Sequence, residues 1–399
     1  MNDRTSARDV IVIGGGVIGL SIAWELAQHG VAVRVLEQGL FGQEASWAGA
    51  GMLPPGNPEQ AQTIEARLRG GSHLLWPQWT EQLRAQTGID NGFHRCGGIE
   101  VRPPTFAVGA GDVSPPVSQT TESLSKKIAA WRAEGVTAIP LSASELHQRL
   151  PALNPDIADG YLLPELGQVR NPRHLKALYQ ACAAGGVDLR AGTPVVDFIR
   201  DGKRIAAVRT AGDEFQAAEY IVASGAWSRS LLQRAGYDTS FEPVRGQIVL
   251  LETPTVLFRH VIEVGARYLV PRPDGRILVG STEERVGFEK RTTAAGVAGL
   301  LDFARQLVPA LDDAQVERCW AGLRPFAPGG LPRIGRVPGT TNLTLAAGHF
   351  RAGLQLSPMT AVLIRQLILR QPGNEWAAEL MPKREEISNI SNLKFQISN

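Results

Sequence analysis

A glycine-rich turn between an apolar strand and a helix is the feature that most limits how this chain can fold. Residues 10–13 read VIVI, a wholly apolar run that is typical of a parallel strand buried on both faces. Residues 14–19 read GGGVIG and match the pattern G-x-G-x-x-G. Apolar side chains then recur at helical spacing as far as Ala27, and a second apolar strand ends at Glu37. Residues 9–38 therefore predict one βαβ unit.

Each part of this unit has a task in binding a dinucleotide. The first glycine makes the tight turn, the second lets a pyrophosphate approach the backbone, and the third lets the helix and strand pack closely. The start of the helix offers amide donors and a positive dipole to the phosphates. Glu37 stands where a carboxylate accepts hydrogen bonds from the adenosine ribose. We therefore predict a dinucleotide site, whereas the motif alone does not separate NAD from FAD.

Two later segments favour FAD. Residues 42–52 read GQEASWAGAGM and follow the second strand with few bulky side chains, where an NAD domain would proceed to another β-α repeat. Such a loop suits a cofactor that extends across the domain and lays its second ring system on exposed backbone. Residues 346–353 read AAGHFRAG and run from a strand through glycine into a helix. They offer a second helix N-terminus to the same extended molecule.

Composition excludes several classes of protein. The 399 residues are enough for two domains or one large α/β unit. Forty-one basic and 39 acidic residues give a net charge of +2, which is too little for non-specific nucleic-acid binding. The three cysteines form no C-x-x-C pair, and their odd number argues against a secreted disulfide scaffold. A reducing cytoplasm is the simplest compartment.

The chain also gives no signal for a membrane span or a metal site. Its most apolar stretch, residues 10–27, is interrupted by four glycines and by Glu25, so we predict no membrane segment. The seven histidines show no i, i+4 pairing and stand beside no cysteine pair, so we predict no metal ligand set. The oligomeric state stays open, with a homo-oligomer as one alternative.

The remaining chain alternates between helical and strand patterns. Residues 103–122, rich in Pro, Gly, Ser and Thr, predict a flexible surface loop, and residues 384–399 predict a flexible tail. Periodicity and turn residues predict helices at 59–86, 173–184 and 359–369, a three-stranded meander within 187–224, a hairpin at 267–279 and a strand at 343–348.

Six motifs together resemble the D-amino acid oxidase superfamily of FAD-dependent oxidoreductases, and within it the glycine oxidase branch of thiamine biosynthesis. The resemblance covers about residues 8–370. The motifs are the glycine pattern at 14–19, AGAGM at 48–52, VASGAW at 222–227, PVRGQ at 243–247, WAGLRP at 320–325 and GHFRAG at 348–353.

The resemblance implies an α/β fold with a Rossmann-like FAD-binding domain and a mostly antiparallel-sheet substrate domain. We assign residues 1–90, 167–240 and 326–383 to the FAD-binding domain, and residues 91–166 and 241–325 to the substrate-binding domain. The cofactor-binding residues that it implies are Gly14, Gly16, Val17, Ile18, Gly19, Glu37, Gln38, Ala45, Ser46, Ala50, Gly51, Met52, Val195, Gly225, His349, Phe350, Arg351, Ala352, Gly353, Leu354 and Gln355.

Three residues carry the chemistry that the resemblance implies. Arg324 would hold the substrate carboxylate, Tyr268 would sit over the substrate, and Arg351 would lie beside the carboxylate. Arg324 also makes physical sense alone, because a planar guanidinium grips a carboxylate with two parallel hydrogen bonds and stays charged. The alternative for Arg324 is a structural salt bridge.

Two positions depart from the family pattern. Glu283 falls where a better-known member carries an apolar side chain over the substrate. Its carboxylate would attract the substrate amine or restrict the pocket, unless it is a surface glutamate at a strand end. Cys319 lies near the position at which monomeric sarcosine oxidase bonds its flavin covalently. We interpret Cys319 as a small buried hydrophobic residue and predict noncovalent FAD.

These observations predict oxidation of glycine, sarcosine and small D-amino acids to 2-oxo acid, ammonia and hydrogen peroxide, with molecular oxygen as the oxidant. The flavin N5 would accept a hydride from the α-carbon once the substrate amine is neutral. A D-amino acid dehydrogenase or a sarcosine oxidase-like enzyme of the same fold stays open as an alternative. So does a flavin-binding subunit that catalyses nothing alone.

Overall fold

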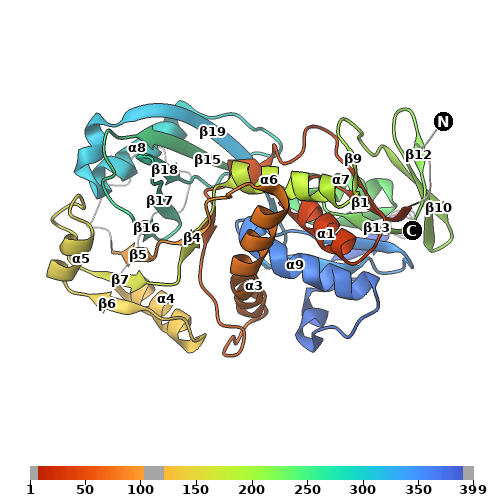
Figure 1. Cartoon of the computed structure of the whole chain (residues 1–399), viewed down its shortest axis with the longest axis horizontal. Helices are drawn as coiled ribbons and strands as arrows, with labels where there is room; N and C mark the ends of the chain where they lie inside the picture. Colours follow the sequence, from red (N-terminus) through yellow and green to blue (C-terminus); the bar gives the residue numbers. More distant parts are fainter. Residues whose placement is uncertain (1–7, 103–120, 390–399) are drawn as a thin grey trace, which may run out of the picture.

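The structure is a computed structural model that describes residues 8–102 and 121–389, and two large β-sheets dominate this part of the chain (Figure 1). One sheet has six strands and the other has eight. Helices pack against both sheets, which confirms the predicted α/β class. The predicted loop at 103–122 lies outside the described residues, except that 121 and 122 begin a helix.

The six-stranded sheet contains the predicted βαβ unit. Its order is β20-β21-β13-β1-β2-β9, and every pair is parallel except the antiparallel edge pair β20–β21. The side chains of β2 are all buried, as expected for a central parallel strand. The strands are β1 (Arg8–Ile13), β2 (Val33–Leu36), β9 (Asp188–Arg190), β13 (Ala217–Val222), β20 (Arg333–Arg336) and β21 (Leu343–Ala347).

Helices cover one face of this sheet. A single hydrophobic cluster joins β1, β2 and β13 to four helices: α1 (Val17–Gln28), α3 (Ile64–Thr87), α6 (Asn171–Ala184) and α9 (Gly353–Ile368). A second cluster fills the opposite face beneath the meander and α7 (Ser228–Arg234). The meander consists of β10 (Asp197–Asp201), β11 (Arg204–Arg209) and β12 (Glu214–Phe215), which confirms its prediction.

The eight-stranded sheet is antiparallel except where β16 pairs with β5. Its order is β19-β15-β18-β17-β16-β5-β7-β6. The predicted hairpin at 267–279 forms β17 and β18. The strands are β5 (Gly98–Val101), β6 (Ile139–Leu141), β7 (Gly160–Leu163), β15 (Glu242–Glu252), β16 (Val261–Val264), β17 (Arg267–Pro271), β18 (Arg276–Gly280) and β19 (Gln315–Phe326).

Smaller elements complete the described fold. The helices are α2 (Ala45–Ala48), α4 (Thr121–Ala133), α5 (Ala143–Arg149) and α8 (Ala294–Leu307), with short 3-10 turns at Gly225–Trp227, Pro309–Asp313 and Glu375–Leu380. The strands β3 (Met52–Leu53), β4 (His94–Arg95) and β8 (Gly167–Gln168) form a small sheet, and β14 (Tyr237–Thr239) pairs with β22 (Ile387–Asn389).

Two helices differ from their predicted bounds for physical reasons. Helix α3 starts at Ile64, not at residue 59, because the Thr63 hydroxyl accepts the Ala66 N–H at 3.2 Å and caps the helix there. It runs unbroken through Gly70, where a Cβ would lie 2.5 Å from the backbone nitrogen of Pro58, so this glycine lets the segment at Pro58 pack against the helix. Helix α9 starts at 353, not 359, although it contains Pro358. The Leu354 carbonyl, which loses the proline N–H as a partner, accepts the Ser357 hydroxyl at 2.9 Å.

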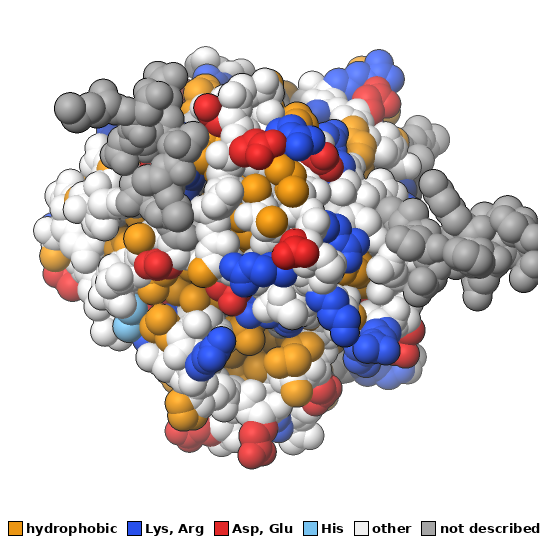
Figure 2. Space-filling model, turned by 90° about the vertical axis from the view of Figure 1, so that its right-hand side faces the viewer, with side chains coloured by type: hydrophobic (Ala, Val, Ile, Leu, Met, Phe, Trp, Pro, Cys, Tyr) orange, Lys and Arg blue, Asp and Glu red, His pale blue; other side chains and the backbone are white. Residues whose placement is uncertain are grey.

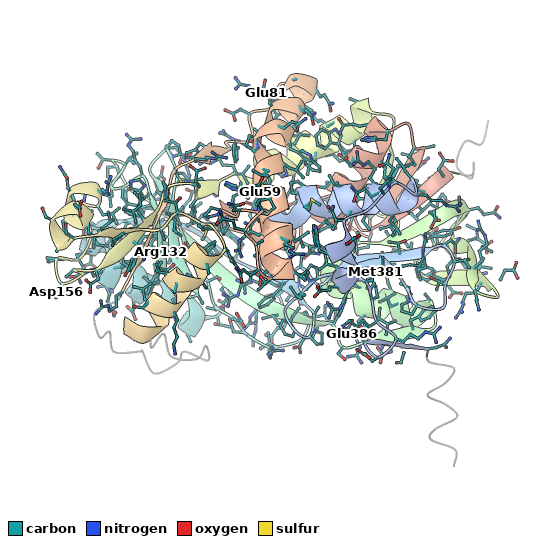
Figure 3. All side chains as sticks on the ribbon, turned by 90° about the horizontal axis from the view of Figure 1, so that it is seen from below. Glu59, Glu81, Arg132, Asp156, Met381 and Glu386 are labelled. Carbon is teal, nitrogen blue, oxygen red and sulfur yellow. The ribbon has the colours of Figure 1, made fainter. Side chains whose placement is uncertain are left out.

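The predicted flexible tail at 384–399 is wrong for its first part. Ile387 is 3% exposed and belongs to the cluster beneath the six-stranded sheet, and β22 pairs antiparallel with β14. Arg333 donates to the carboxylate of Glu386, which is labelled with Met381 in Figure 3. Burial of one isoleucine and this ion pair therefore order residues 384–389, and residues 390–399 lie outside the described part.

The two large sheets divide the sequence as the assigned domains do. The six-stranded sheet takes its strands from 1–90, 167–240 and 326–383. The eight-stranded sheet takes its strands from 91–166 and 241–325, with Phe326 one residue beyond. This distribution supports the two-domain division, which we keep as a proposal.

Candidate active site

A cavity of about 630 Å³ connects the two large sheets. Its walls come from the carboxyl ends of the parallel strands, from α2, from the start of α9 and from one face of the eight-stranded sheet. This size is typical of a small-molecule or cofactor site. Of the predicted site residues, all line the cavity except Gly19 and Glu283.

The carboxyl ends of four neighbouring parallel strands open into this cavity. Strand β1 leads to Gly14 and Gly16, β2 to Glu37, β13 to Gly225, and β21 to His349. Ligands of open parallel sheets bind at this edge. The fold therefore brings together residues that are more than 300 positions apart in the sequence, from 14 to 349.

The glycines of the first turn have separate roles. Gly14 has φ of +115°, and a Cβ there would lie 2.5 Å from the carbonyl oxygen of Ala223, so only glycine fits between β1 and β13. A Cβ on Gly19 would overlap the Gly14 carbonyl oxygen. Gly19 therefore serves the packing of helix on turn, which explains why it does not line the cavity.

Glu37 holds the turn as well as facing the cavity. Its carboxylate accepts the backbone N–H of Gly15 at 2.6 Å and that of Gly39 at 2.8 Å. The Ser46 hydroxyl accepts the Val17 N–H at 2.9 Å, while Gly16 at the start of α1 has no side-chain cap. The amides of the first helical turn thus lie beside the cavity, where an anion is favoured.

Replacing Glu37 by alanine should weaken FAD binding, because the change removes the carboxylate that we expect to bind the ribose and two hydrogen bonds that shape the turn. We expect a loss of roughly 1.5–3 kcal/mol, the value of a hydrogen bond to a charged group. Titration of the apoprotein with FAD, followed by flavin fluorescence, measures it. Glu44→Ala, which changes another carboxylate that lines the cavity, is the control and should leave the affinity close to that of the wild type. An unchanged affinity for Glu37→Ala would place the ribose elsewhere.

Helix α2 and the loop after it join the two sheets. Trp320 of β19 donates its indole N–H to the Ala48 carbonyl at 3.0 Å, and a Cβ on Gly322 would lie 2.6 Å from the Ala48 Cβ. Gly51 has φ of +79° and packs against the Val169 carbonyl. Residues 42–52, the segment of small residues along which we expect the cofactor to lie, therefore pack directly against the eight-stranded sheet.

The start of α9 supplies a second set of backbone donors. Gly348 and Phe350 both have positive φ, +82° and +47°, and together they turn the chain from β21 into the helix. Ala352 caps α9 without a side-chain hydrogen bond, so the first helical amides lie beside the cavity. The His349 Nε2 pairs with the Thr360 hydroxyl at 3.0 Å, and burial lowers the pKa of His349 to about 3, which keeps its ring neutral.

Arg324 and Tyr268 lie over glycines of neighbouring strands. A Cβ on Gly246 of β15 would overlap the Arg324 guanidinium, and a Cβ on Gly280 of β18 would overlap the Tyr268 ring. The Arg324 guanidinium donates to the Ser281 hydroxyl at 2.6 Å and to the Thr282 carbonyl at 2.9 Å. Two missing side chains therefore make room for the two groups predicted to hold the substrate.

The charge on Arg324 faces the cavity. Burial lowers the pKa of Arg324, and the Tyr268 hydroxyl and the Glu284 carboxylate oppose this shift. Burial likewise lowers the pKa of Arg351, and Tyr268 opposes it there as well. Tyr268 thus interacts with both cations. Since guanidinium remains protonated even when buried, this end of the cavity favours an anion such as a carboxylate.

Glu283 lies at the edge of the cavity, where it pairs with Arg351. Its carboxylate accepts a hydrogen bond from Arg351, whose side chain is 43% exposed against 30% for Glu283. Arg351 lines the cavity and Glu283 does not. The departure from the family pattern therefore acts on Arg351 at the edge of the site.

Sequence reasoning missed several charged residues of the cavity. Lys127, Glu263, Glu65 and Arg69 line it together with Trp131. Alternation along the strand that ends at Val264 would have pointed to Glu263, because Tyr268 lies opposite it across the β16–β17 turn. Lys127 comes from α4, and no motif marks it.

Cys319 faces away from the cavity. It does not line the cavity, and it packs with the cluster on the other face of the eight-stranded sheet while its neighbour Trp320 bonds to α2. Burial raises the pKa of its thiol, which makes it a poor nucleophile. The three cysteines are free in the structure.

The described residues give neither a membrane-spanning helix nor a metal cluster. No helix in 8–102 or 121–389 is both long and apolar enough to cross a bilayer. In the same residues, no three His, Cys, Asp or Glu side chains gather as metal ligands would. The face in Figure 2 mixes basic, acidic and apolar side chains.

The fold and the cavity are those of an oxidoreductase that binds a dinucleotide cofactor and, at the other end of the same cavity, a small molecule. The chain belongs to the FAD dependent oxidoreductase family, whose model matches residues 9–367. It is 35% identical over 363 residues to glycine oxidase of Pseudomonas putida, covering 91% of this chain and 94% of that protein. It is also 35% identical to the bifunctional protein ThiO/ThiG of Trichormus variabilis, covering 91% of this chain and 53% of that protein. The crystal structure of glycine oxidase from Geobacillus kaustophilus superposes with a TM-score of 0.86 at 32% identity, over 95% of this chain and 99% of that one.

The cavity residues fit FAD. The cavity reaches from Glu37 and Val195 at the six-stranded sheet to Tyr268 and Arg324 at the eight-stranded sheet, as an extended dinucleotide requires. A Cβ on Gly225 would meet no atom within 4 Å, so the backbone there is open to a ligand. The chain is therefore an FAD-dependent oxidoreductase with two helix N-termini beside its cofactor cavity.

Proposed function

We propose that this protein catalyses the FAD-dependent oxidative deamination of glycine and other small amino acids, including sarcosine and small D-amino acids. The products would be the 2-oxo acid, hydrogen peroxide and ammonia, with methylamine in place of ammonia when the substrate is sarcosine. The observation that carries the proposal is the Arg324 guanidinium, half-buried in the cavity wall beside Tyr268. The identity of 35% to a glycine oxidase supports the substrate class.

The residues of the cavity would position the substrate. Arg324 would bind the carboxylate, and its hydrogen bonds to Ser281 and Thr282 would fix the orientation of the guanidinium. Tyr268 would close the site over the substrate, and Ile248, on the strand beyond Gly280, would leave little room for a side chain. When bound, the flavin of FAD supplies the acceptor for a hydride from the substrate α-carbon. Fixing the α-carbon in this position is the main contribution of the chain.

We also propose that FAD is held noncovalently and that the enzyme serves thiamine biosynthesis. The placement of Cys319 on the far face of the sheet supports the first point, and the ThiO/ThiG relative supports the second. Denaturation should release the flavin into the supernatant. Flavin that stays with the precipitated chain would indicate a covalent bond.

Anaerobic mixing of the yellow holoenzyme with glycine, sarcosine, D-alanine, D-proline and L-alanine tests the function. Glycine should bleach the flavin absorbance, and admission of oxygen should restore it with formation of hydrogen peroxide. Bleaching without peroxide would indicate a dehydrogenase that uses another acceptor. A flavin that no member of the panel reduces would indicate a non-catalytic flavin-binding subunit.

Glu283→Met should strengthen the binding of the substrate carboxylate, because it releases Arg351 from its ion pair. The pair is partly exposed, so its disruption is worth about 0.2–1 kcal/mol, and we expect KM for glycine to fall by up to about fivefold. FAD affinity should stay unchanged, since Glu283 does not line the cavity. Steady-state kinetics on glycine and D-proline measures both KM and the preference for the bulkier substrate. The same substrate profile as the wild type would mean that Arg351 does not contact substrate.

A further inference from the structure

A row of side chains crosses the eight-stranded sheet at the cavity. Glu100 of β5 pairs in register with Glu263 of β16, Glu263 with Tyr268 of β17, and Tyr268 with Gly280 of β18. Residues in register on neighbouring strands point to the same face of a sheet. Glu263 therefore stands beside Tyr268 on the cavity face, on the side away from Arg324.

One lysine, Lys127, lies close to both carboxylates of this row. Lys127 donates to Glu100 Oε2 at 2.5 Å, and Glu100 Oε1 accepts the Gly265 N–H at 3.2 Å. Glu100 is fully buried and does not line the cavity, whereas Lys127 and Glu263 both do. The charge of Lys127 interacts with both carboxylates, and that of Glu263 is the one that a molecule in the cavity can reach.

Helix α4, which carries Lys127, is fixed to the same sheet. Its Arg132, labelled in Figure 3, donates to the Ala138 carbonyl at 2.8 Å and lies over the Tyr161 ring of β7. Glu65 and Arg69 of α3 are the other charged side chains that face this part of the cavity among the described residues, and Arg69 is paired with Glu134.

The spacing across the sheet suits an amino acid. The Arg324 guanidinium bonds Ser281 just after β18, and β16 lies two strands beyond β18, or about 10 Å. Two hydrogen bonds of about 2.8 Å and the short chain from carboxylate to amine cover most of that distance. A substrate whose carboxylate binds Arg324 therefore has the length to place its amine near Glu263.

We infer that Glu263 accepts a hydrogen bond from the substrate ammonium and takes up its proton, leaving the neutral amine that hydride transfer requires. The inference rests on the proposed function. One N–H bond of the ammonium breaks, the nitrogen keeps the electron pair, and the proton forms an O–H bond on the Glu263 carboxylate. The nearby positive charge of Lys127 favours the ionised form of that carboxylate.

The titration of Glu263 matches this task. Burial raises its pKa to about 7, the Lys127 charge opposes the shift and the Glu100 charge adds to it. A base with a pKa near the working pH is best able to accept a proton and pass it on. Below a pH of about 7, Glu263 is protonated and cannot accept the proton of the substrate ammonium. The value of kcat/KM should therefore fall about tenfold for each further pH unit.

Glu263→Gln tests the inference because it keeps the shape and removes the acceptor. At pH 7 to 8, kcat/KM for glycine should fall by roughly 10²–10⁴-fold. The difference from the wild type should vanish at alkaline pH, where free glycine is already neutral at its amine. Glu65→Gln, which changes another cavity carboxylate, is the matched control and should keep the wild-type pH profile. Glu263→Asp should retain the acid limb of the profile with lower activity, which keeps the test valid if the glutamine variant does not fold.

Ligand binding separates this role from a structural one. Acetate carries a carboxylate but no amine, and its binding, followed by the flavin spectrum, should be the same in the wild type and in Glu263→Gln. Equal weakening of acetate and glycine, or a uniform loss of activity with an unshifted pH profile, would overturn the inference. Failure of glycine to bleach the wild-type flavin would instead overturn the proposed function.

Discussion

Arg324→Ala should raise KM for every amino acid substrate by about 30-fold to about 5,000-fold. The expected loss in apparent binding is about 2–5 kcal/mol, by analogy with the removal of one partner from a buried charge pair. A carboxylate that enters the cavity gives up its hydration, and this is costly unless a cation meets it. In the wild type, Arg324 is that cation, and its hydrogen bonds to Ser281 and Thr282 hold it in place.

Two comparisons make this prediction specific. Arg324→Lys keeps the charge but loses the planar pair of donors, so this variant should still bind substrate weakly and show little activity at low substrate concentration. An amine that lacks a carboxylate should react almost equally with the wild type and both variants. Steady-state kinetics on glycine and on such an amine decides the matter. A small and equal effect on both substrates would make Arg324 structural and the proposed substrate class wrong.

The sequence predicted those parts of the molecule that local patterns determine. The βαβ unit was predictable because strand, glycine turn and helix follow one another within residues 9–38, and the structure confirms the unit as β1, α1 and β2. The hairpin of β17 and β18 was predictable from its turn residues. Arg324 and Tyr268 were identified by resemblance, and the structure places both in the cavity wall.

Non-local pairing was not predictable in the same way. Glu100 and Glu263 meet because β5 joins β16 in parallel, although 163 positions separate them, and Lys127 reaches them from a helix that follows the segment 103–120. Arg351 pairs with Glu283 across 68 positions. The first of these contacts depends on strand register, and the others depend on how a helix and two loops pack, none of which a local pattern sets. The charged end of the site therefore becomes visible only when the sheet is assembled.

Gly246 shows how such register determines function, and it gives the second large prediction. Strand β15 carries this glycine opposite Gly322, and the three atoms nearest to a Cβ at 246 all belong to the Arg324 guanidinium. The backbone of Gly246 does not have positive φ, so alanine is compatible with the strand. Gly246→Ala should therefore displace Arg324 without unfolding the sheet, and it should raise KM for glycine by a similar factor to Arg324→Ala. FAD affinity and the thermal unfolding temperature should change little.

A double variant shows whether the two changes act through one contact. If Gly246→Ala acts only by moving the guanidinium, then adding it to Arg324→Ala should cause no further loss, because the displaced group is already absent. Independent effects would instead add within about 0.5 kcal/mol. KM for glycine in the four proteins of the cycle measures the coupling. Full additivity would mean that Gly246 shapes the site by some route other than Arg324. Complete non-additivity would mean that the absence of a side chain at Gly246 acts by making room for the Arg324 guanidinium.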